Sequence, residues 1–339
     1  MFFISISCAS LNANTVNDLK SATKNLNSTS DIEKIKNLVN FQAQYINGLY
    51  VNTFGDLKSQ PIIFIHGGPG FNSFNFEFST ANYLANKGFY VVVYDQRGSG
   101  RSELTPIDQF KFEKSFEDLD IIIENLHIKK PILVGHSFGG TLAIKYAQKS
   151  AHKVKSLFLV SAPIDQPEMV KSILENCDKN YKLSNNIDAL QYIEAIKKFI
   201  FEGGKYQINA EYGQYLFAHA TACGLYNPDV PNQNQKFLYN KLLKLPDSKL
   251  LTDAKPLPFQ GFIQNEKWLS ENNLPLLKSL KIPIFGIFGN NDGLFNKKQF
   301  SDIENIIGKQ NISIIEHASH NVFIDQQDEF LNFIILKNN

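Results

Sequence analysis

The chain has 339 residues, of which 43% are hydrophobic and 20% are charged, an ordinary balance for a globular protein. Its 34 basic and 33 acidic residues leave a net charge of +1, so there is no electrostatic reason to expect a nucleic-acid partner or an anionic membrane surface. Three cysteines without metal-ligand spacing exclude a disulfide framework, although one pair can bridge, and no apolar run reaches the roughly 20 residues of a membrane span.

Residues 1–30 are predicted to form a flexible leader. Ala9 to Thr29 is rich in Asn, Ser, Thr and Lys and has no sustained apolar period. The stretch from Met1 to Cys8 is apolar and ends in small residues before a cysteine, so it also fits a truncated lipoprotein signal. It has no Lys or Arg and is short for a complete signal. We expect a cytoplasmic protein, with a cell-envelope lipoprotein anchored through Cys8 as the alternative.

Two local signals follow the leader. The tetrapeptide Ser-Asp-Ile-Glu at 30–33 has the spacing of a capping box, so a short helix is predicted to start there. Asn47-Gly48 then lies between loosely alternating residues, which is typical of a two-residue β-hairpin turn. The hairpin is expected to span residues 41–54.

The rest of the chain alternates apolar runs with helical patterns, for example at 116–126 and 140–148. Uninterrupted apolar strands suit a parallel sheet that is covered on both faces, and their alternation with helices predicts a doubly wound α/β fold. Residues 165–270 differ, because they contain helical and aromatic segments but no comparable strand. We therefore predict a core of residues 31–164 and 271–339, with 165–270 inserted as a helical cap. The apolar runs are residues 61–65, 89–94, 131–134, 156–160 and 282–288, with a shorter one at 311–315.

The segment Gly-His-Ser-Phe-Gly at 135–139 fits the pattern G-x-S-x-G. An apolar run precedes it and a helical pattern follows, which is the setting that a nucleophile elbow requires. Small residues on both sides of Ser137 allow a turn tight enough to expose the hydroxyl. We predict that Ser137 is a nucleophile, and the alternative is a glycine-rich turn with an incidental serine.

A serine nucleophile needs a neighbouring base and an acid that orients the base. Asp292 follows one predicted strand and His320 follows the next, so both come from loops at strand ends. The chain order Ser, Asp, His is the order found in α/β-hydrolases. We predict Ser137, Asp292 and His320 as a catalytic triad. His317 is the alternative base, and Asp165 is the alternative acid.

A glycine-rich motif, His-Gly-Gly-Pro-Gly, begins at His66 after the first apolar run. Glycines let the backbone approach a substrate, so the N–H groups of Gly68 and Phe138 are predicted to form the oxyanion hole. His66 itself is predicted to be a structural hydrogen-bonding residue. Asp95 and Arg97 are predicted to fix their loop through an internal charge-assisted contact.

Five segments carry a family resemblance: His-Gly-Gly-Pro-Gly at 66–70, Tyr-Asp-Gln-Arg-Gly-Ser-Gly-Arg-Ser at 94–102, the elbow at 135–139, Gly-Asn-Asn-Asp at 289–292 and Ser-His-Asn at 319–321. Together they resemble the proline iminopeptidase (prolyl aminopeptidase) family within the α/β-hydrolase superfamily. The match covers the predicted core on both sides of the cap. The resemblance implies an α/β-hydrolase core, a helical cap, no cofactor, and removal of an N-terminal residue, often proline, from peptides.

The chain departs from that family in two places. Those enzymes usually carry Gly-Gly-Ser-Trp-Gly at the elbow, whereas this chain has His136 and Phe138. Their cap also supplies glutamates that hold the ammonium group of the substrate, and the acidic residues available here are Glu202 and Glu211. The alternative for each is an exposed glutamate on a helix surface.

The sequence therefore predicts a serine hydrolase that forms an acyl-enzyme, and the resemblance implies an aminopeptidase acting on a short peptide. A carboxylesterase or lactonase acting on a small ester is the alternative within the same chemistry, favoured by an apolar cap pocket. Other readings are a carbon–carbon or epoxide hydrolase, the latter disfavoured by Ser137 in place of an Asp nucleophile, and a ligand-binding protein without turnover. No metal, cofactor, nucleic acid or membrane span is expected.

Overall fold

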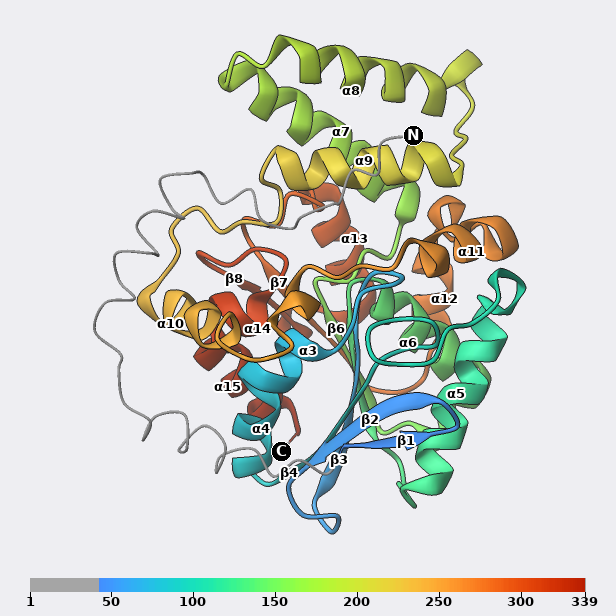
Figure 1. Cartoon of the computed structure of the whole chain (residues 1–339), viewed down its shortest axis with the longest axis vertical. Coiled ribbons are helices and arrows are strands. Elements are labelled where there is room, and N and C mark those ends of the chain that lie inside the picture. Colours follow the sequence, from blue (N-terminus) through green and yellow to red (C-terminus); the bar gives the residue numbers. More distant parts are fainter. Residues whose placement is uncertain (1–42, 339) are drawn as a thin grey trace.

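The centre of the molecule is one sheet of eight strands in a computed structural model that describes residues 43–338 (Figure 1). Its strands are β1 (Gln44–Ile46), β2 (Leu49–Phe54), β3 (Gln60–Ile65), β4 (Phe89–Tyr94), β5 (Ile132–His136), β6 (Ser156–Val160), β7 (Ile284–Gly289) and β8 (Ile312–Ile315). They lie in the order β1-β2-β4-β3-β5-β6-β7-β8. β2 pairs antiparallel with β1 and β4, and every other pairing is parallel. The predicted, mostly parallel sheet is confirmed.

The predicted hairpin is formed by β1 and β2. Asn47 and Gly48 join the two strands with φ angles of 50° and 77°, the positive values that a two-residue hairpin turn needs. The predictions for the leader 1–30, for the helix start at 30–33 and for Cys8 lie outside the described residues.

Each central strand is buried on both faces. In β3, Ile63 and Ile65 belong to one hydrophobic cluster, while Ile62 and Phe64 belong to another. Successive side chains of a strand point to opposite faces of the sheet. A strand covered on both sides therefore has an uninterrupted apolar sequence, and for this reason the strands could be predicted from the sequence.

Helices supply the cover on both faces. The helices outside the segment between β6 and β7 are α3 (Phe74–Phe76), α4 (Asn82–Asn86), α5 (Phe112–Asn125), α6 (Phe138–Ser150), α13 (Lys297–Ile307), α14 (Val322–Asp325) and α15 (Gln327–Asn338). Leu119 of α5 and Leu142 of α6 join one cluster, while Phe323 of α14 and Phe330 of α15 join the other. Figure 1 shows these two pairs of helices on opposite sides of the sheet.

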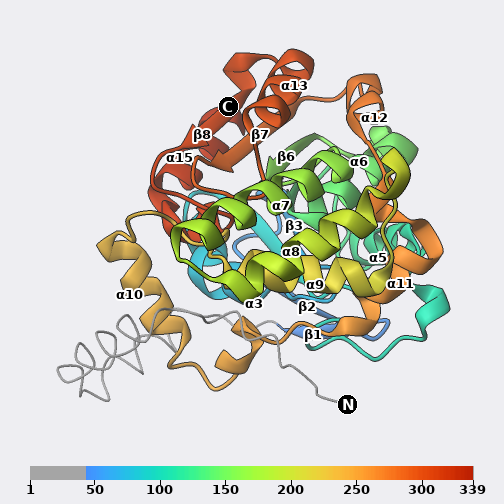
Figure 2. The same ribbon diagram turned by 90° about the horizontal axis from the view of Figure 1, so that it is seen from above.

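Between β6 and β7 the chain forms helices and turns but no strand, all within the described residues. We call residues 161–283 the helical insertion. Figure 1 shows three of its helices, α7, α8 and α9, stacked beyond the end of the sheet, and Figure 2 shows them from above. The insertion contains α7 (Gln166–Leu183), α8 (Ile187–Ile200), α9 (Ala210–Ala222), α10 (Gln233–Leu242), α11 (Pro256–Glu266) and α12 (Leu274–Ser279).

The insertion packs onto the core through its own apolar side chains. Met169 of α7, Ile193 of α8 and Leu216 of α9 belong to the same cluster as β3 and α6. Cys177 of α7 and Cys223, which follows α9, form a disulfide with their Cα atoms 5.5 Å apart. The insertion contains the predicted cap, whose boundaries at 165 and 270 stay predictions.

Short 3-10 or π-helical turns complete the connections. They are η2 (Glu77–Ala81), η3 (Ile107–Gln109), η4 (Ala151–Lys153), η5 (Glu202–Gly204), η6 (Ser248–Leu251), η7 (Trp268–Ser270) and η8 (Lys309–Asn311). None of the described helices is long and apolar enough to span a membrane.

Candidate active site

Ser137 lies on a sharp turn between β5 and α6. Its backbone has φ 54° and ψ −123°, and a non-glycine residue adopts such a positive φ only where the surroundings impose it. The backbone N–H of Ser137 donates to the carbonyl of Val160 in β6 at 2.9 Å. The turn is therefore anchored to the neighbouring strand, and it has the geometry that the G-x-S-x-G pattern predicts.

The two glycines of the motif allow close backbone packing. A Cβ atom on Gly135 would lie 2.6 Å from the carbonyl oxygen of Gly139. A Cβ atom on Gly139 would collide with the carbonyl oxygens of Ile65 and His66, at the end of β3. Such distances are shorter than any side chain tolerates, so both positions require glycine.

The structure brings Asp292 and His320 together. His320 Nδ1 lies 2.8 Å from Asp292 Oδ2, and both side chains are buried. The other carboxylate oxygen of Asp292 accepts the N–H of Leu294 at 3.1 Å. The contact between His320 Nδ1 and Asp292 Oδ2 fixes the tautomer of His320. Nδ1 carries the proton, and Nε2 is left as a base.

His136 places the elbow beside this pair. Its Nε2 donates to the carbonyl oxygen of His320 at 2.9 Å, and the two imidazole rings lie 4.8 Å apart. Burial, with the nearby charge of His320, holds the pKa of His136 well below its usual value, so this imidazole is neutral. Among the described residues, no hydrogen bond joins the Ser137 hydroxyl to His320, and such contacts are often long before a substrate binds.

Gly68 and Phe138 meet Ser137 at one small cavity of about 10 Å³. Phe138 is the first residue of α6, so its N–H has no acceptor within the helix and is available to a ligand. The cavity wall is mostly apolar and contains one amide, from Gln166. The full lining is Gly68, Ser137, Phe138, Pro163, Gln166, Met169, Phe217 and Trp268.

His66 connects the glycine-rich loop to the loop after β4. Its Nε2 accepts the backbone N–H of Gln96 at 2.8 Å, and its Nδ1 lies 2.7 Å from the carbonyl of Gly67. Gln96 Nε2 donates to the carbonyl of His66 at 2.6 Å. Burial lowers the pKa of His66. One ring nitrogen thus binds the loop after β4 and the other lies against the backbone of its own loop, which is a structural arrangement.

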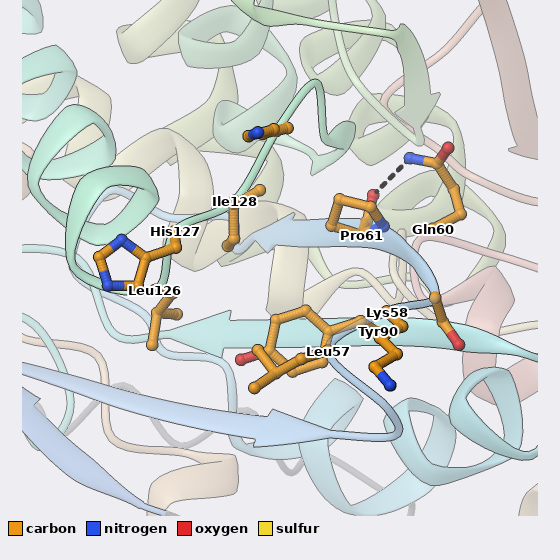
Figure 3. A pocket seen from close by; sticks show the side chains of 10 residues that line it. Leu57, Lys58, Gln60, Pro61, Tyr90, Leu126, His127 and Ile128 are labelled. Atoms are coloured by element: carbon orange, nitrogen blue, oxygen red, sulfur yellow. Dashed lines mark hydrogen bonds between the residues drawn. The ribbon is translucent and has the colours of Figure 1, made fainter.

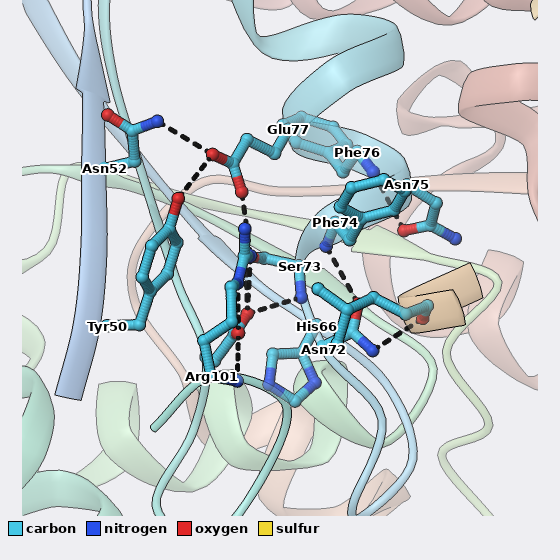
Figure 4. Close-up of polar contacts among 12 residues, drawn as sticks. Tyr50, Asn52, His66, Asn72, Ser73, Phe74, Asn75, Phe76, Glu77 and Arg101 are labelled. Atoms are coloured by element: carbon cyan, nitrogen blue, oxygen red, sulfur yellow. Dashed lines mark hydrogen bonds and ion pairs between the residues drawn. The ribbon is translucent and has the colours of Figure 1, made fainter. Parts of the chain in front are cut away.

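A buried charge network supports the loop after β4 (Figure 4). Arg101 Nε donates to Asp95 Oδ2 at 2.8 Å, and Arg101 Nη2 pairs with Glu77 Oε2 at 2.8 Å. Tyr50 and Asn52 donate to the other oxygen of Glu77 at 2.8 and 2.7 Å. Burial opposes the charge on Asp95, yet Arg101 outweighs it and lowers the pKa of Asp95. Burial raises the pKa of Glu77, with Arg101 opposing this effect.

The predicted contact between Asp95 and Arg97 is therefore wrong. The backbone turns back at Ser99 to Ser102, where the N–H of Ser102 donates to the carbonyl of Ser99 at 2.9 Å, and this turn carries Arg101 over Asp95. Arg97 instead pairs with Asp118 of α5 at 2.7 Å.

The alternative base and acid lie elsewhere. His317 is exposed, and its Nδ1 lies 3.1 Å from Asp229 Oδ1. Asp165 is the N-cap of α7, where it accepts the N–H of Glu168 at 3.2 Å. Its second oxygen accepts Asn272 Nδ2 at 2.7 Å. Neither residue lines the cavity at Ser137.

The two glutamates predicted to bind substrate are also away from this cavity. Glu202 begins η5 and is exposed, with Gln207 Nε2 at 3.4 Å. Glu211 lies in the first turn of α9, is exposed, and accepts the hydroxyl of Tyr215 at 3.2 Å. Their role in substrate binding stays a prediction.

Sequence reasoning did not identify the residues that the insertion brings to the site. Gln166, Phe217 and Trp268 line the cavity, and the ring of Tyr226 lies 5.2 Å from that of His320. Asp325, five positions after His320, is buried next to the histidine loop. Of these residues, only Asp325 could have been found from the sequence, because it is an acidic residue in an apolar segment shortly after the histidine.

A larger cavity of about 370 Å³ lies at the opposite, amino-terminal ends of β3 and β4 (Figure 3). Its wall includes Gln60, Tyr90 and His127. None of the predicted site residues lines it. In the part of the chain that the structure describes, no group of three or more His, Cys, Asp or Glu side chains is arranged to hold a metal ion.

The comparison with protein families matches residues 60–327 to the alpha/beta hydrolase fold family. The chain therefore belongs to the α/β-hydrolases, which confirms the predicted superfamily and fold. Its curated relatives include the proline iminopeptidase of Thermoplasma volcanium, 35% identical over 175 residues that cover 49% of this chain and 54% of that protein. The proline iminopeptidase of Saccharolobus solfataricus is 32% identical over 155 residues, or 42% of this chain and 49% of that protein.

The matched region thus spans about half the length of these two relatives. Among solved structures, a proline iminopeptidase-related protein from Thermus thermophilus covers 87% of this chain and 95% of its own, with a TM-score of 0.64 at 20% identity. At that identity the likeness shows the shared fold.

Proposed function

We propose that the chain is a serine hydrolase in which Ser137 is the nucleophile, His320 the base and Asp292 the acid that orients it. The observation that carries this proposal is the buried contact of 2.8 Å between His320 Nδ1 and Asp292 Oδ2 beside a strained serine turn. The shared cavity of Ser137, Gly68 and Phe138 supports the same assignment.

In the acylation step, Ser137 Oγ attacks the carbonyl carbon of the substrate while His320 Nε2 takes the hydroxyl proton. The carbonyl oxygen becomes an oxyanion, which the N–H groups of Gly68 and Phe138 stabilise. Asp292 accepts the Nδ1 hydrogen bond and stabilises the imidazolium. Collapse of the tetrahedral adduct breaks the bond to the leaving group, which receives the proton from His320 and departs.

In the deacylation step, water attacks the acyl-enzyme carbonyl and gives a proton to His320 Nε2. The second tetrahedral adduct collapses, the Ser137–acyl bond breaks, and the proton returns to Ser137 Oγ. The product is the free carboxylic acid. No redox partner is required at any point.

As the substrate we propose a peptide with a free amino terminus. The enzyme releases its first residue, and proline is the first candidate for that residue. This rests on the proline iminopeptidase relatives and on the five motifs quoted above. The cavity at Ser137 is small and mostly apolar, so a compact terminal residue has to displace less of the wall than the middle of a chain would.

A second candidate, hydrolysis of a small ester, is favoured by one observation. The described residues that line the cavity at Ser137 include the amide of Gln166 but no carboxylate. An ammonium group binds best beside a negative charge, whereas an uncharged acyl group needs none.

The deciding experiment compares prolyl-4-nitroanilide with a short-chain 4-nitrophenyl ester, using the wild type and Ser137→Ala. Turnover of the anilide that disappears in the variant supports the aminopeptidase. Turnover of the ester alone, also lost in the variant, supports the second candidate. Hydrolysis that persists in Ser137→Ala contradicts both.

Glu202 and Glu211 are proposed as carriers of the charge that holds the amino group. Glu202→Gln and Glu211→Gln should each be measured with both substrates. A rise in KM for the anilide at unchanged ester turnover supports the assignment, and unchanged KM in both variants removes it. Lys205→Gln, an exposed neighbour of Glu202, is a matched charge-removing control.

A further inference from the structure

The peptide backbone around His320 is held by two buried side chains in addition to the contact with Asp292. On one side, the N–H of Ser319 donates to Asp325 Oδ2 at 2.8 Å. On the other side, the carbonyl oxygen of His320 accepts His136 Nε2 at 2.9 Å. The imidazole is thus fixed by its own hydrogen bond and by the backbone before and after it.

Asp325 also connects this backbone to the helical insertion. Its second oxygen, Oδ1, accepts Gln235 Nε2 from the first turn of α10 at 2.7 Å. Asn232, the N-cap of α10, donates to the carbonyl oxygen of Asp325 at 2.6 Å and to Gln326 Oε1 at 2.8 Å. One carboxylate therefore bridges α10 and the histidine loop, which are 85 residues apart between Gln235 and His320.

The surroundings of Asp325 are unusual for a buried acidic side chain, because the described residues provide it with no ion-pair partner. It is 2% exposed, and its carboxylate has two amide-type donors and no cation among the hydrogen-bond partners that the described residues provide. The charges that act on it come from Asp292 and His320, while α10 presents neutral amides. Burying an acidic group in such a setting costs stability, and a functional role is one reason for a protein to keep it.

We propose that Asp325 is a positioning residue for His320, which holds the histidine backbone in register with Ser137 and ties it to α10 of the insertion. This inference rests on the proposed triad. Asp325 does not touch the reacting atoms. It acts through the N–H of Ser319. A displacement of the base by about 1 Å can slow the proton transfer by about 10²-fold.

The test is the rate at which a fluorophosphonate phosphonylates Ser137 in the full chain, measured at one pH near neutrality. Asp325→Ala removes both contacts, and we expect a loss of at least about 10-fold. Asp325→Asn keeps both, because its Oδ1 can accept from Ser319 and its Nδ2 can donate to Gln235 Oε1, a buried atom without a hydrogen-bond partner among the described residues. We expect Asp325→Asn to recover most of the rate.

Rescue by Asp325→Asn separates positioning from the loss of the acidic side chain itself. Both variants lose the acid, but only Asp325→Ala loses the two hydrogen bonds, so only its rate should fall. Asn232→Ala is the control, because it removes the contacts of α10 with the backbone carbonyl of Asp325 and with Gln326. It keeps both hydrogen bonds of the carboxylate, and its rate should stay near that of the wild type.

Failure of the inference is distinguishable from failure of the triad. If the wild type is not phosphonylated at Ser137, the proposed function is wrong. If the wild type is phosphonylated but folded Asp325→Ala reacts at the wild-type rate, or folded Asp325→Asn is as slow as Asp325→Ala, the role of Asp325 is overturned. Should Asp325→Ala not fold, Asp325→Asn decides alone, and a rate at least about 10-fold below that of the wild type overturns the role.

Discussion

Gln166 is the polar group that the cavity wall offers to a bound acyl group. Its Nε2 donates to Thr141 Oγ1 at 3.2 Å and to the carbonyl of Pro163 at 2.9 Å. Its Oε1 is buried and has no hydrogen-bond partner among the described residues. A buried acceptor without a partner is costly, and a substrate that brings an N–H group removes this cost.

Gln166 should therefore discriminate between prolyl and cyclopentanecarbonyl groups. The two differ at one ring position, where prolyl has a nitrogen and cyclopentanecarbonyl has a CH2 group. We expect Gln166→Leu to lower the ratio of their kcat/KM values by about 5- to 10-fold, the worth of one hydrogen bond. Gln166→Glu should raise the ratio, because a carboxylate binds the charged ring nitrogen more strongly. The two substrates are compared as 4-nitroanilides or 4-nitrophenyl esters, and a ratio that is the same in all three proteins would remove Gln166 from substrate recognition.

Asp325 should also make stability depend on pH. Burial raises the pKa of Asp325 from 3.8 to about 7. Between these values the folded protein holds a proton that the unfolded chain releases, so the contribution of Asp325 to the free energy of unfolding falls as pH rises. Asp325→Asn lacks this loss. Its free energy of unfolding, relative to the wild type, should increase from pH 4 to pH 7 by up to about 4 kcal/mol.

Urea unfolding of both proteins at a series of pH values measures this difference directly. A difference that stays constant across the window would mean that Asp325 has an ordinary pKa in the folded protein.

Among the structural elements, the loop between β4 and α5 depends on Arg101. Arg101 is the cation between two buried carboxylates, Asp95 and Glu77. Arg101→Met should cost about 3–5 kcal/mol of unfolding free energy, because both charges lose their partner. Lys114→Met removes an exposed pair with Glu117 and should cost less than about 1 kcal/mol. Chemical denaturation compares the two, and equal losses would contradict the importance of the buried network.

The helical insertion closes the site. A space of about 10 Å³ hardly holds one water molecule, so a substrate must displace side chains of the wall. Phe217 of α9 is such a side chain, and Phe217→Ala should raise kcat/KM for 4-nitrophenyl hexanoate relative to acetate by about 5- to 10-fold. Phe237→Ala, on the exposed surface of α10, is the matched control and should leave the ratio unchanged. A ratio unchanged by Phe217→Ala would place the acyl group elsewhere.

For the molecule as a whole, the parallel sheet and the turn at Ser137 could be predicted because both leave local patterns. Strands buried on both faces read as continuous apolar runs, and the elbow needs glycines at fixed offsets from the serine. The order of Asp292 and His320 after two successive strands was sufficient to pair them, and the structure puts them in contact.

Contacts between distant segments could not be predicted in this way. Gln166 and Tyr226 reach the site through the packing of the insertion, which no local pattern encodes. Arg97 and Arg101 are equally good partners for Asp95 by sequence, and only the turn at Ser99 decides between them. Side-chain choices of this kind depend on tertiary structure, so sequence patterns predict the candidate nucleophile but not the residues around it.

Mass spectrometry after reaction with a fluorophosphonate shows directly whether Ser137 is the nucleophile of the α/β-hydrolase core. We expect one phosphonyl group per chain, located on Ser137, and no adduct in folded Ser137→Ala. An adduct on another residue, or a folded wild-type protein that remains unlabelled, would show that Ser137 is not the nucleophile.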